Sequence, residues 1–527
     1  MRTELAALDS SVIIAVVGAG SMGAGIAQVA AAAGHRTLLF DHNPDVVTQA
    51  LARIANGLTQ QVQRNRMTPA ARSALLARIT AVSTLEQLAG AGLVVEAVVE
   101  TLSVKRDLFS RLERICAGDT LLASNTSSLS ISAIAAGLSR PGNLAGMHFF
   151  NPAPVMQLVE VVSGITTDRR VAQTLFDTAR AWHKRPVHTR STPGFIVNRV
   201  ARPFYGEALR LLEEGAADHA TIDALLREAG GFRMGPFELT DLIGQDVNYA
   251  VTCSVFDAFH QDKRYLPSSI QRELVEGGLL GRKSGRGFYD YSSSAVAPLP
   301  TVAGQQRAPT QIEVHGPLGV AEPLLPLWQR AGIQITRGGG DAGVIRAGTA
   351  LIALSDGRSA SQRAAESGCA DTLLFDLALD YATTTRIALT AADQASSAAL
   401  ESATGLFQAA GKAVSLIDDT PGLLVLRTVC MLANEGADTV LQQVCDAAAV
   451  DTAMCAGVNY PLGPLAWADR LTPALVLRVL SNLQQAYGSE RYRPSLLLRR
   501  KALTGALFHE TGRPSVANQQ PPDETAP

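Results

Sequence analysis

One segment of the chain occurs twice, and this duplication limits the possible folds more than any other feature. Residues 192–199 (TPGFIVNR) recur as residues 420–427 (TPGLLVLR), an offset of 228. The same offset relates Gly235-Pro236 to Gly463-Pro464, and Glu207, Asp223 and Asp241 to Glu435, Asp451 and Asp469. Chance rarely maintains one offset over such a span, so we infer that one domain is present in two copies.

Each copy has the pattern of a helical domain. Thr192 and Pro193 are typical of an N-cap and a first helical turn, and apolar residues then follow with helical spacing. We predict an all-helical domain over 190–291, with its second copy over 411–510. The tail at 511–527 is rich in Pro, Gln and Asp, so we expect it to be disordered.

The segment before the first copy alternates strand and helix patterns. Residues 13–17 predict a buried parallel strand, 23–33 predict a small-residue helix, and 37–40 predict a second strand. Further strands are predicted at 93–99 and 120–123. This succession predicts a doubly wound, Rossmann-like parallel sheet over residues 10–189.

The region between the copies predicts a smaller α/β unit. A linker rich in Ser and Pro ends near residue 309, and strand patterns follow at 312–314 and 371–375. The turn at 316–319 lacks the glycine spacing of a nucleotide-binding turn. We therefore interpret 310–410 as a degenerate α/β segment without a nucleotide site.

The composition is that of a globular protein. Hydrophobic residues make up 47% and charged residues 18%, and the net charge of −2 argues against a nucleic-acid binder. The six cysteines show no pairing pattern and no clustering with histidine, which argues against a disulfide framework or a metal site. The apolar run 12–17 is too short to cross a membrane. We expect a soluble, cytoplasmic protein.

A glycine-rich turn between the first strand and helix predicts a dinucleotide site. Gly18 permits the tight turn, Gly20 lets the backbone approach a pyrophosphate, and Gly23 lets helix and strand pack closely. Asp41 ends the second strand, where a carboxylate binds ribose hydroxyls and repels a 2′-phosphate. This favours NAD over NADP, with a purely structural strand–helix turn as the alternative.

A histidine and a glutamate twelve residues apart are candidates for the chemistry. His148 lies just beyond the strands of the first segment, in the run HFFNP, and a histidine suits proton transfer near neutral pH. Glu160 lies in the apolar run LVEVV, where a carboxylate needs a partner. The alternatives are a core histidine and a surface carboxylate.

The sequence resembles the 3-hydroxyacyl-CoA dehydrogenase family over residues 10–290. The resemblance lies in the runs at 95–100 (VEAVVE), 124–128 (SNTSS), 148–152 with Glu160, 193–199, 235–238 (GPFE) and 285–289 (GRGFY). The duplicated domain is similar to that of longer bacterial members, some of which act on 3-hydroxyadipyl-CoA in the degradation of aromatic acids of the phenylacetate type. The resemblance implies NAD-dependent interconversion of (S)-3-hydroxyacyl-CoA and 3-oxoacyl-CoA, in fatty-acid or aromatic-acid degradation.

The resemblance also implies a role for individual residues. His148 is the general base, oriented by Glu160, and Ser127 and Asn198 bind the substrate oxygens. The positions matching cofactor contacts are Glu100, Lys105, Asn151 and Lys283. Ser127 as a helix cap and Lys105 as a solvated side chain are the alternatives. Four arginines at positions 64, 66, 72 and 78 either meet the CoA phosphates from a helical hairpin or form a solvated face.

The second copy predicts a single active site. Leu426 replaces Asn198, and neither a second HFFNP run nor a second glycine turn accompanies it. We hypothesise that this copy covers the apolar face of the first, as an internal pseudo-dimer partner, with a homo-oligomer as a further possibility. The functional alternatives are a catalytically silent NAD-binding scaffold and a dehydrogenase of a free 3-hydroxy acid.

Overall fold

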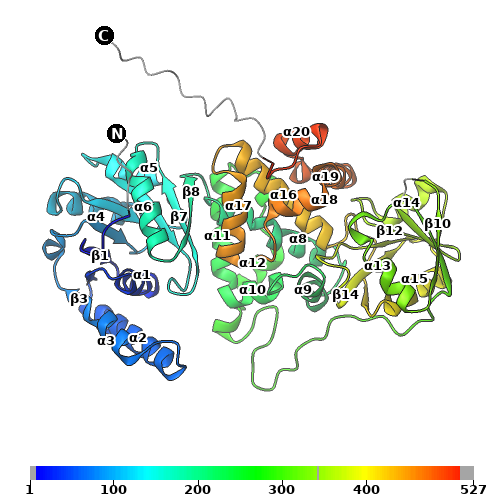
Figure 1. Cartoon of the computed structure of the whole chain (residues 1–527), viewed down its shortest axis with the longest axis horizontal. Coiled ribbons are helices and arrows are strands. Elements are labelled where there is room, and N and C mark those ends of the chain that lie inside the picture. Colours follow the sequence, from blue (N-terminus) through cyan, green and yellow to red (C-terminus); the bar gives the residue numbers. More distant parts are fainter. Residues whose placement is uncertain (1–6, 341–342, 511–527) are drawn as a thin grey trace, which may run out of the picture.

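The computed structural model describes residues 7–340 and 343–510. The molecule is elongated, with one sheet at each end and the helices of both copies between them (Figure 1). The tail that we predicted to be disordered, 511–527, lies outside the described residues.

The first sheet has eight strands in the order β3-β2-β1-β4-β5-β6-β7-β8. Strands β1 to β6 are parallel, whereas β7 and β8 run the opposite way, because β7 pairs antiparallel with β6. The strands are β1 (Ile14–Val17), β2 (Thr37–Phe40), β3 (Ile79–Val82), β4 (Leu93–Glu96), β5 (Leu121–Ser124), β6 (Leu144–Phe149), β7 (Leu158–Ser163) and β8 (Arg185–Arg190). The predicted doubly wound sheet is confirmed, but His148 lies within β6 and not beyond the strands.

Helices cover both faces of this sheet. Ile14 and Val16 of β1 belong to one apolar cluster, and Ala15 and Val17 belong to another on the opposite face. Burial on both faces explains why the strands read as continuous apolar runs. The helices are α1 (Ser21–Ala32), α2 (Pro44–Gln63), α3 (Pro69–Ala77), α4 (Leu102–Ile115), α5 (Ile131–Ala135) and α6 (Arg169–Ala181).

The two helical copies have matching elements. The first contains α7 (Val197–Val200), α8 (Arg202–Glu213), α9 (His219–Glu228), α10 (Pro236–Ile243), α11 (Gln245–Ala258) and α12 (Ser269–Glu276). The second contains α16 (Val425–Leu441), α17 (Ala447–Val458), α18 (Pro464–Leu471), α19 (Pro473–Tyr487) and α20 (Leu496–Thr504). Helix α16 is buried along almost its whole length, because it lies in the middle of the helical layer (Figure 1).

The copies pack against each other through reciprocal ion pairs. Glu207 accepts hydrogen bonds from Arg427 (2.7 Å) and Arg491 (2.8 Å) of the second copy. In return, Glu435 accepts one from Arg199 (2.6 Å) and another from Arg264 (3.3 Å) of the first. Because the glutamate of each copy is bound by arginines of the other, the interface is isologous and pseudo-twofold within one chain.

The second sheet has seven strands in the order β10-β9-β11-β12-β13-β14-β15. The strands are β9 (Gln311–His315), β10 (Gln334–Gly338), β11 (Val344–Ala347), β12 (Ala350–Leu354), β13 (Thr372–Phe375), β14 (Arg386–Ala391) and β15 (Ala413–Leu416), and the helices are α13 (Leu324–Arg330), α14 (Ala360–Ser367) and α15 (Ser397–Ala409). Strand β15 lies beyond residue 411, where we placed the start of the second helical copy.

The duplication extends into this sheet, further than the sequence predicted. Strands β13, β14 and β15 begin 228 residues after β6, β7 and β8, and α15 begins 228 residues after α6. The directions also match, since β12 to β15 pair parallel, antiparallel and parallel, as β5 to β8 do. The degenerate segment is therefore a partial second copy of the first sheet.

A single apolar core joins the second sheet to both helical copies. It runs from Val200 in the first copy through Met431 in α16 to Leu374 in β13. Because this core has no internal boundary, the second copy is part of the structural unit that supports the first. Within the described ranges, no helix combines the length and apolar character needed to cross a membrane.

Candidate active site

The glycine-rich turn has the geometry that a dinucleotide requires. Gly18 has φ of +102°, and a Cβ there would lie 2.5 Å from the carbonyl oxygen of Ala97. A Cβ at Gly23 would collide with the Gly18 carbonyl oxygen at 1.8 Å, whereas nothing lies within 4 Å of one at Gly20. Gly20 is also the N-cap of α1 and offers no side-chain acceptor, so the first N–H groups of α1 point into this space. The turn therefore fits a pyrophosphate.

Asp41 lies beside this turn, at the end of β2. Its Oδ2 accepts a hydrogen bond from Ala19 N at 2.8 Å, and its Oδ1 accepts one from Asn43 N at 3.0 Å. These contacts fix the carboxylate next to the turn while leaving it partly exposed. This is the position from which a carboxylate can accept hydrogen bonds from an adenosine ribose.

His148 and Glu160 face each other across the antiparallel pair β6 and β7. His148 Nδ1 lies 2.7 Å from Glu160 Oε2, and both side chains are buried. A carboxylate only accepts, so in the neutral imidazole Nδ1 carries the proton and Nε2 keeps its lone pair. Among the described residues Nε2 has no partner, and the ring lines a cavity of about 540 Å³.

Glu160 also holds the beginning of the first helical copy. Its Oε1 accepts hydrogen bonds from Ile196 N and Val197 N, each at 3.0 Å. Our prediction that Thr192 caps this helix was wrong, because the helix begins at Val197 and the Thr192 hydroxyl has no hydrogen-bond partner in the described ranges. Gly194 has a positive φ of +71°, which turns the chain so that a carboxylate from the sheet replaces a local cap.

Ser127 and Asn198 meet on the wall of this cavity. Asn198 Nδ2 donates to the Ser127 carbonyl oxygen at 3.4 Å, and both residues line the space beside His148. Glu100 lies on the same wall and accepts hydrogen bonds from Ser127 N (2.9 Å) and Thr126 Oγ1 (2.6 Å). Burial opposes ionisation of Glu100, but the Thr126 hydrogen bond and the Lys105 charge outweigh it and lower its pKa.

The remaining predicted cofactor residues differ in their surroundings. Lys105 is buried, which contradicts the alternative of a solvated side chain, and its ammonium lies 2.6 Å from Glu96 Oε1 and 3.2 Å from Glu100 Oε2. Asn151 is exposed and lines the cavity. Lys283 does not line it, and instead forms an ion pair with Asp246 at the surface.

The structure adds cavity residues that the sequence did not single out. Arg202, Tyr205 and Asn248 line the cavity from helices of the first copy, and Val458 does so from the end of α17 in the second. Their separation along the chain explains why no local pattern reveals them. The second copy thus contributes directly to the wall of the candidate site.

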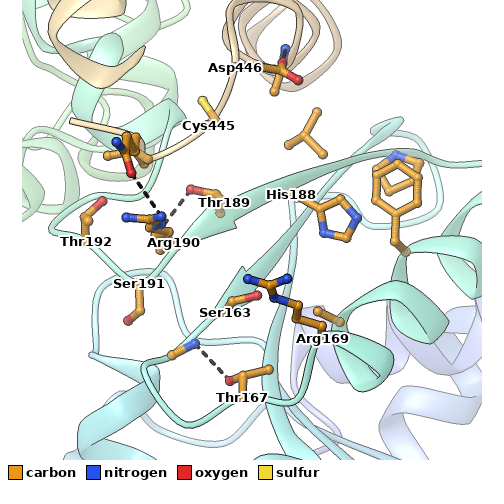
Figure 2. Close-up of a pocket in the computed structure, with 18 of the residues that line it drawn as sticks. Ser163, Thr167, Arg169, His188, Thr189, Arg190, Ser191, Thr192, Cys445 and Asp446 are labelled. Atoms are coloured by element: carbon orange, nitrogen blue, oxygen red, sulfur yellow. Dashed lines mark hydrogen bonds between the residues drawn. The ribbon is translucent and has the colours of Figure 1, made fainter. Parts of the chain in front are cut away.

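A larger cavity, of about 1070 Å³, lies between β8 and the beginning of α17. Figure 2 shows Arg169 and His188 on one side of it and Cys445 and Asp446 on the other. At its rim, Arg190 N donates to the Val444 carbonyl oxygen at 2.9 Å. None of the predicted site residues lines this cavity, which belongs to the contact between the second copy and the first sheet.

The hairpin of α2 and α3 bears on the CoA prediction. Arg72 donates to Thr59, and Arg78 donates to the Ala31 carbonyl oxygen, so both have partners within the protein. Arg64 and Arg66 are exposed. The predicted helical hairpin is confirmed, and these two arginines are the most exposed of the four.

Three family models match the chain. They are the 3-hydroxyacyl-CoA dehydrogenase NAD binding domain (residues 13–192), the 3-hydroxyacyl-CoA dehydrogenase C-terminal domain (194–291 and 422–517), and the 3-hydroxybutyryl-CoA dehydrogenase reduced Rossmann-fold domain (352–421). The second model matches twice, which confirms the duplication, and the third matches the partial copy of the first sheet.

Individual proteins are similar over most of the chain. A 3-hydroxyadipyl-CoA dehydrogenase from Escherichia coli is 45% identical over 93% of this chain and 97% of its own length. A probable 3-hydroxybutyryl-CoA dehydrogenase from Bacillus subtilis is 41% identical over 53% of this chain and 96% of its own. A crystal structure of a 3-hydroxybutyryl-CoA dehydrogenase from Escherichia coli, 43% identical, covers 94% of this chain and 99% of its own with a TM-score of 0.86.

Proposed function

The chain belongs to the 3-hydroxyacyl-CoA dehydrogenase family, and from this premise we propose that it interconverts (S)-3-hydroxyacyl-CoA and 3-oxoacyl-CoA thioesters, with NAD as cofactor. The observation that carries the proposal is the buried pair of His148 and Glu160, whose free ring nitrogen lines the cavity that Ser127 and Asn198 share. We place this reaction in fatty-acid or aromatic-acid degradation in the cytoplasm.

Each residue has a defined task in this proposal. NAD, when bound, would accept the hydride that leaves C3 of the hydroxyacyl chain. His148 Nε2 takes the hydroxyl proton during oxidation and returns it during reduction, while Glu160 fixes the tautomer and stabilises the imidazolium. Ser127 and Asn198 donate hydrogen bonds to the substrate oxygens, where charge develops.

The cofactor and domain assignments complete the proposal. Gly18, Gly20, Gly23 and Asp41 bind the adenosine and pyrophosphate half of NAD, as the open turn at α1 supports. Glu100, Lys105, Asn151 and Lys283 remain predicted cofactor contacts, with Lys283 the least supported because it lies outside the cavity. We propose domains at 10–189, 190–291, 310–410 and 411–510, with the last boundary moved beyond β15, which belongs to the second sheet. The last domain acts as an internal pseudo-dimer partner.

Turnover with substrate tests the proposal. The protein should oxidise NADH in the presence of acetoacetyl-CoA and do so far more slowly with free acetoacetate. The His148→Gln variant should lose about 10²–10⁴-fold in turnover while still binding NADH. His260→Gln, at an exposed histidine, is the matched control and should retain turnover.

Three results would count against the proposal. NADH binding without turnover indicates a silent scaffold. Equal rates with acetoacetate and its CoA ester indicate a free-acid dehydrogenase. An unchanged rate in His148→Gln removes the proposed mechanism.

A further inference from the structure

One buried arginine lacks the partner that every comparable arginine has. Six arginines of the described chain are buried, and five of them lie within 4.0 Å of a carboxylate. The exception is Arg202, at 7% exposure, which forms no ion pair with any described residue. The five paired arginines are Arg199, Arg264, Arg386, Arg427 and Arg491.

The contacts of Arg202 leave part of its guanidinium without a hydrogen-bond partner among the described residues. One nitrogen, Nη1, donates to Thr252 Oγ1 at 3.0 Å, and the group stacks over the Tyr205 ring at 4.9 Å. Its Nε is buried and has no hydrogen-bond partner in residues 7–340 and 343–510. An arginine stays charged even when burial lowers its pKa, as it does here, so a buried cation remains uncompensated.

Arg202 lines the candidate active site, and together with Thr252 it also lines a separate cavity of about 50 Å³. It follows Asn198 by four residues in the nearly continuous helix of α7 and α8, so the two side chains lie about one turn, or roughly 6 Å, apart on the same face. Asn198 is where the oxygen at C3 is expected. A group that contacts Arg202 would therefore lie about one helical turn from C3, a distance that the distal end of a short acyl chain can span.

A second polar group lines the same cavity. Asn248 is buried and lines it, and its Oδ1 accepts a hydrogen bond from Gln271 Nε2 at 3.1 Å. This contact directs the Asn248 amide nitrogen, a donor, away from Gln271. No hydrogen bond from that nitrogen occurs within the described part of the chain. Arginine and amide donors together suit a carboxylate.

The second copy provides an internal control. The residues 228 positions after Arg202, Tyr205, Asn248 and Thr252 are Cys430, Ala433, Val476 and Leu480, all buried and none of them charged. The common fold therefore does not require a polar group at any of these four positions. The arginine and its polar neighbours belong to the copy that has the histidine.

We propose that Arg202, with Asn248, binds the distal carboxylate of a dicarboxylic 3-oxoacyl or 3-hydroxyacyl chain and so determines substrate specificity. This inference rests on the proposed function, since it concerns the substrate of the same cavity. Occupation of the site by that carboxylate gives the buried guanidinium the ionic partner that no described residue supplies.

Two thioesters of equal chain length test the proposal. Steady-state kcat/KM is measured with NADH for 3-oxoadipyl-CoA and for 3-oxohexanoyl-CoA, which has a methyl group in place of the carboxylate. We expect the protein to favour 3-oxoadipyl-CoA by roughly 10²-fold or more, since an unpaired buried charge penalises the neutral chain. In Arg202→Met this ratio should fall towards one. In Arg202→Lys it should lie between the ratio of the unaltered protein and that of Arg202→Met. Arg272→Met, which removes an exposed arginine, should retain the original ratio.

The outcomes separate the two proposals. A ratio near one in the unaltered protein overturns the role of Arg202, whether or not the Met variant folds. The same holds for a ratio that Arg202→Met leaves unchanged. If acetoacetyl-CoA is reduced in either case, the proposed function stands, whereas no turnover of any 3-oxoacyl-CoA overturns both.

Discussion

Replacing Glu160 by glutamine should reverse the tautomer of the catalytic histidine. In the native site, Oε1 of Glu160 accepts two backbone N–H groups, from Ile196 and Val197, and Oε2 faces His148 Nδ1. The oxygen of a glutamine amide must take the Oε1 position, because two donors already point there. Its NH2 group then faces Nδ1, so Nδ1 must accept and the ring proton moves to Nε2. With Nε2 protonated, His148 has no lone pair to offer the substrate hydroxyl.

The size of the effect follows from what a general base contributes to catalysis. Loss of the base costs about 10²–10⁴-fold in turnover, which corresponds to roughly 3–5 kcal/mol of the activation free energy. The cost in stability should be smaller, about 1–3 kcal/mol, because the amide oxygen still accepts the two backbone N–H groups and only a charged contact is lost. The expected variant is a folded protein that binds NADH but turns over slowly.

The second copy provides the control for this experiment. Asp376 lies 228 residues after His148, and it accepts hydrogen bonds from Leu424 N, Val425 N and Leu426 N at the start of α16. Asp376→Asn should therefore reduce stability by about 1–3 kcal/mol and leave the turnover of folded protein unchanged. Turnover and urea unfolding are measured for both variants. If Glu160→Gln retains turnover within threefold, or if Asp376→Asn loses as much, the tautomer argument is wrong.

Two further predictions concern the contact between the copies. Burial alone raises the pKa of Glu207, but Arg491 and Arg427 outweigh it and hold the pKa at about 2. This depressed pKa contributes about 3 kcal/mol of stability above pH 4.5, and the contribution is lost as the pH falls from there through 2. Urea unfolding between pH 7 and pH 3 should show about 2 kcal/mol of that loss. A Glu207→Gln variant whose free energy of unfolding changes equally with pH would contradict it. Deletion of 411–527 should give insoluble or inactive protein, because it divides the common core and removes Val458 from the site. Soluble, fully active protein would contradict the structural role of the second copy.

Local patterns predicted the features that depend on residues close together in sequence. The glycine turn, the strands that precede and follow it, and the duplicated segment were all recognisable, because their residues recur at fixed short spacings. The start of the first helical copy was predicted wrongly. Thr192 has the residue type of an N-cap, but the acceptor that holds this helix is Glu160, on a strand of the other domain. Tertiary contacts of this kind leave no local pattern.

The same limit applied to Arg202. Its sequence neighbours, on an amphipathic helix, gave no reason to expect a charge without a partner, because the partners of the other buried arginines come from distant segments. The lack of a partner becomes visible only when the whole environment is known. The extension of the duplication into the second sheet was hidden for a related reason, since strands preserve their order and length while their residues change.

Comparison of the two copies separates the structural role of Glu160 from its chemical role. In the first copy Glu160 both holds the helix start and orients His148. In the second, Ala388 occupies the position of Glu160, and Asp376, at the position of the histidine, holds the helix start from the neighbouring strand. The shorter carboxylate of Asp376 thus binds the N–H groups at the start of the helix without an imidazole beside it. The glutamate–histidine arrangement is therefore not required by the fold, and its presence in the first copy alone is best explained by the proton transfer proposed for it.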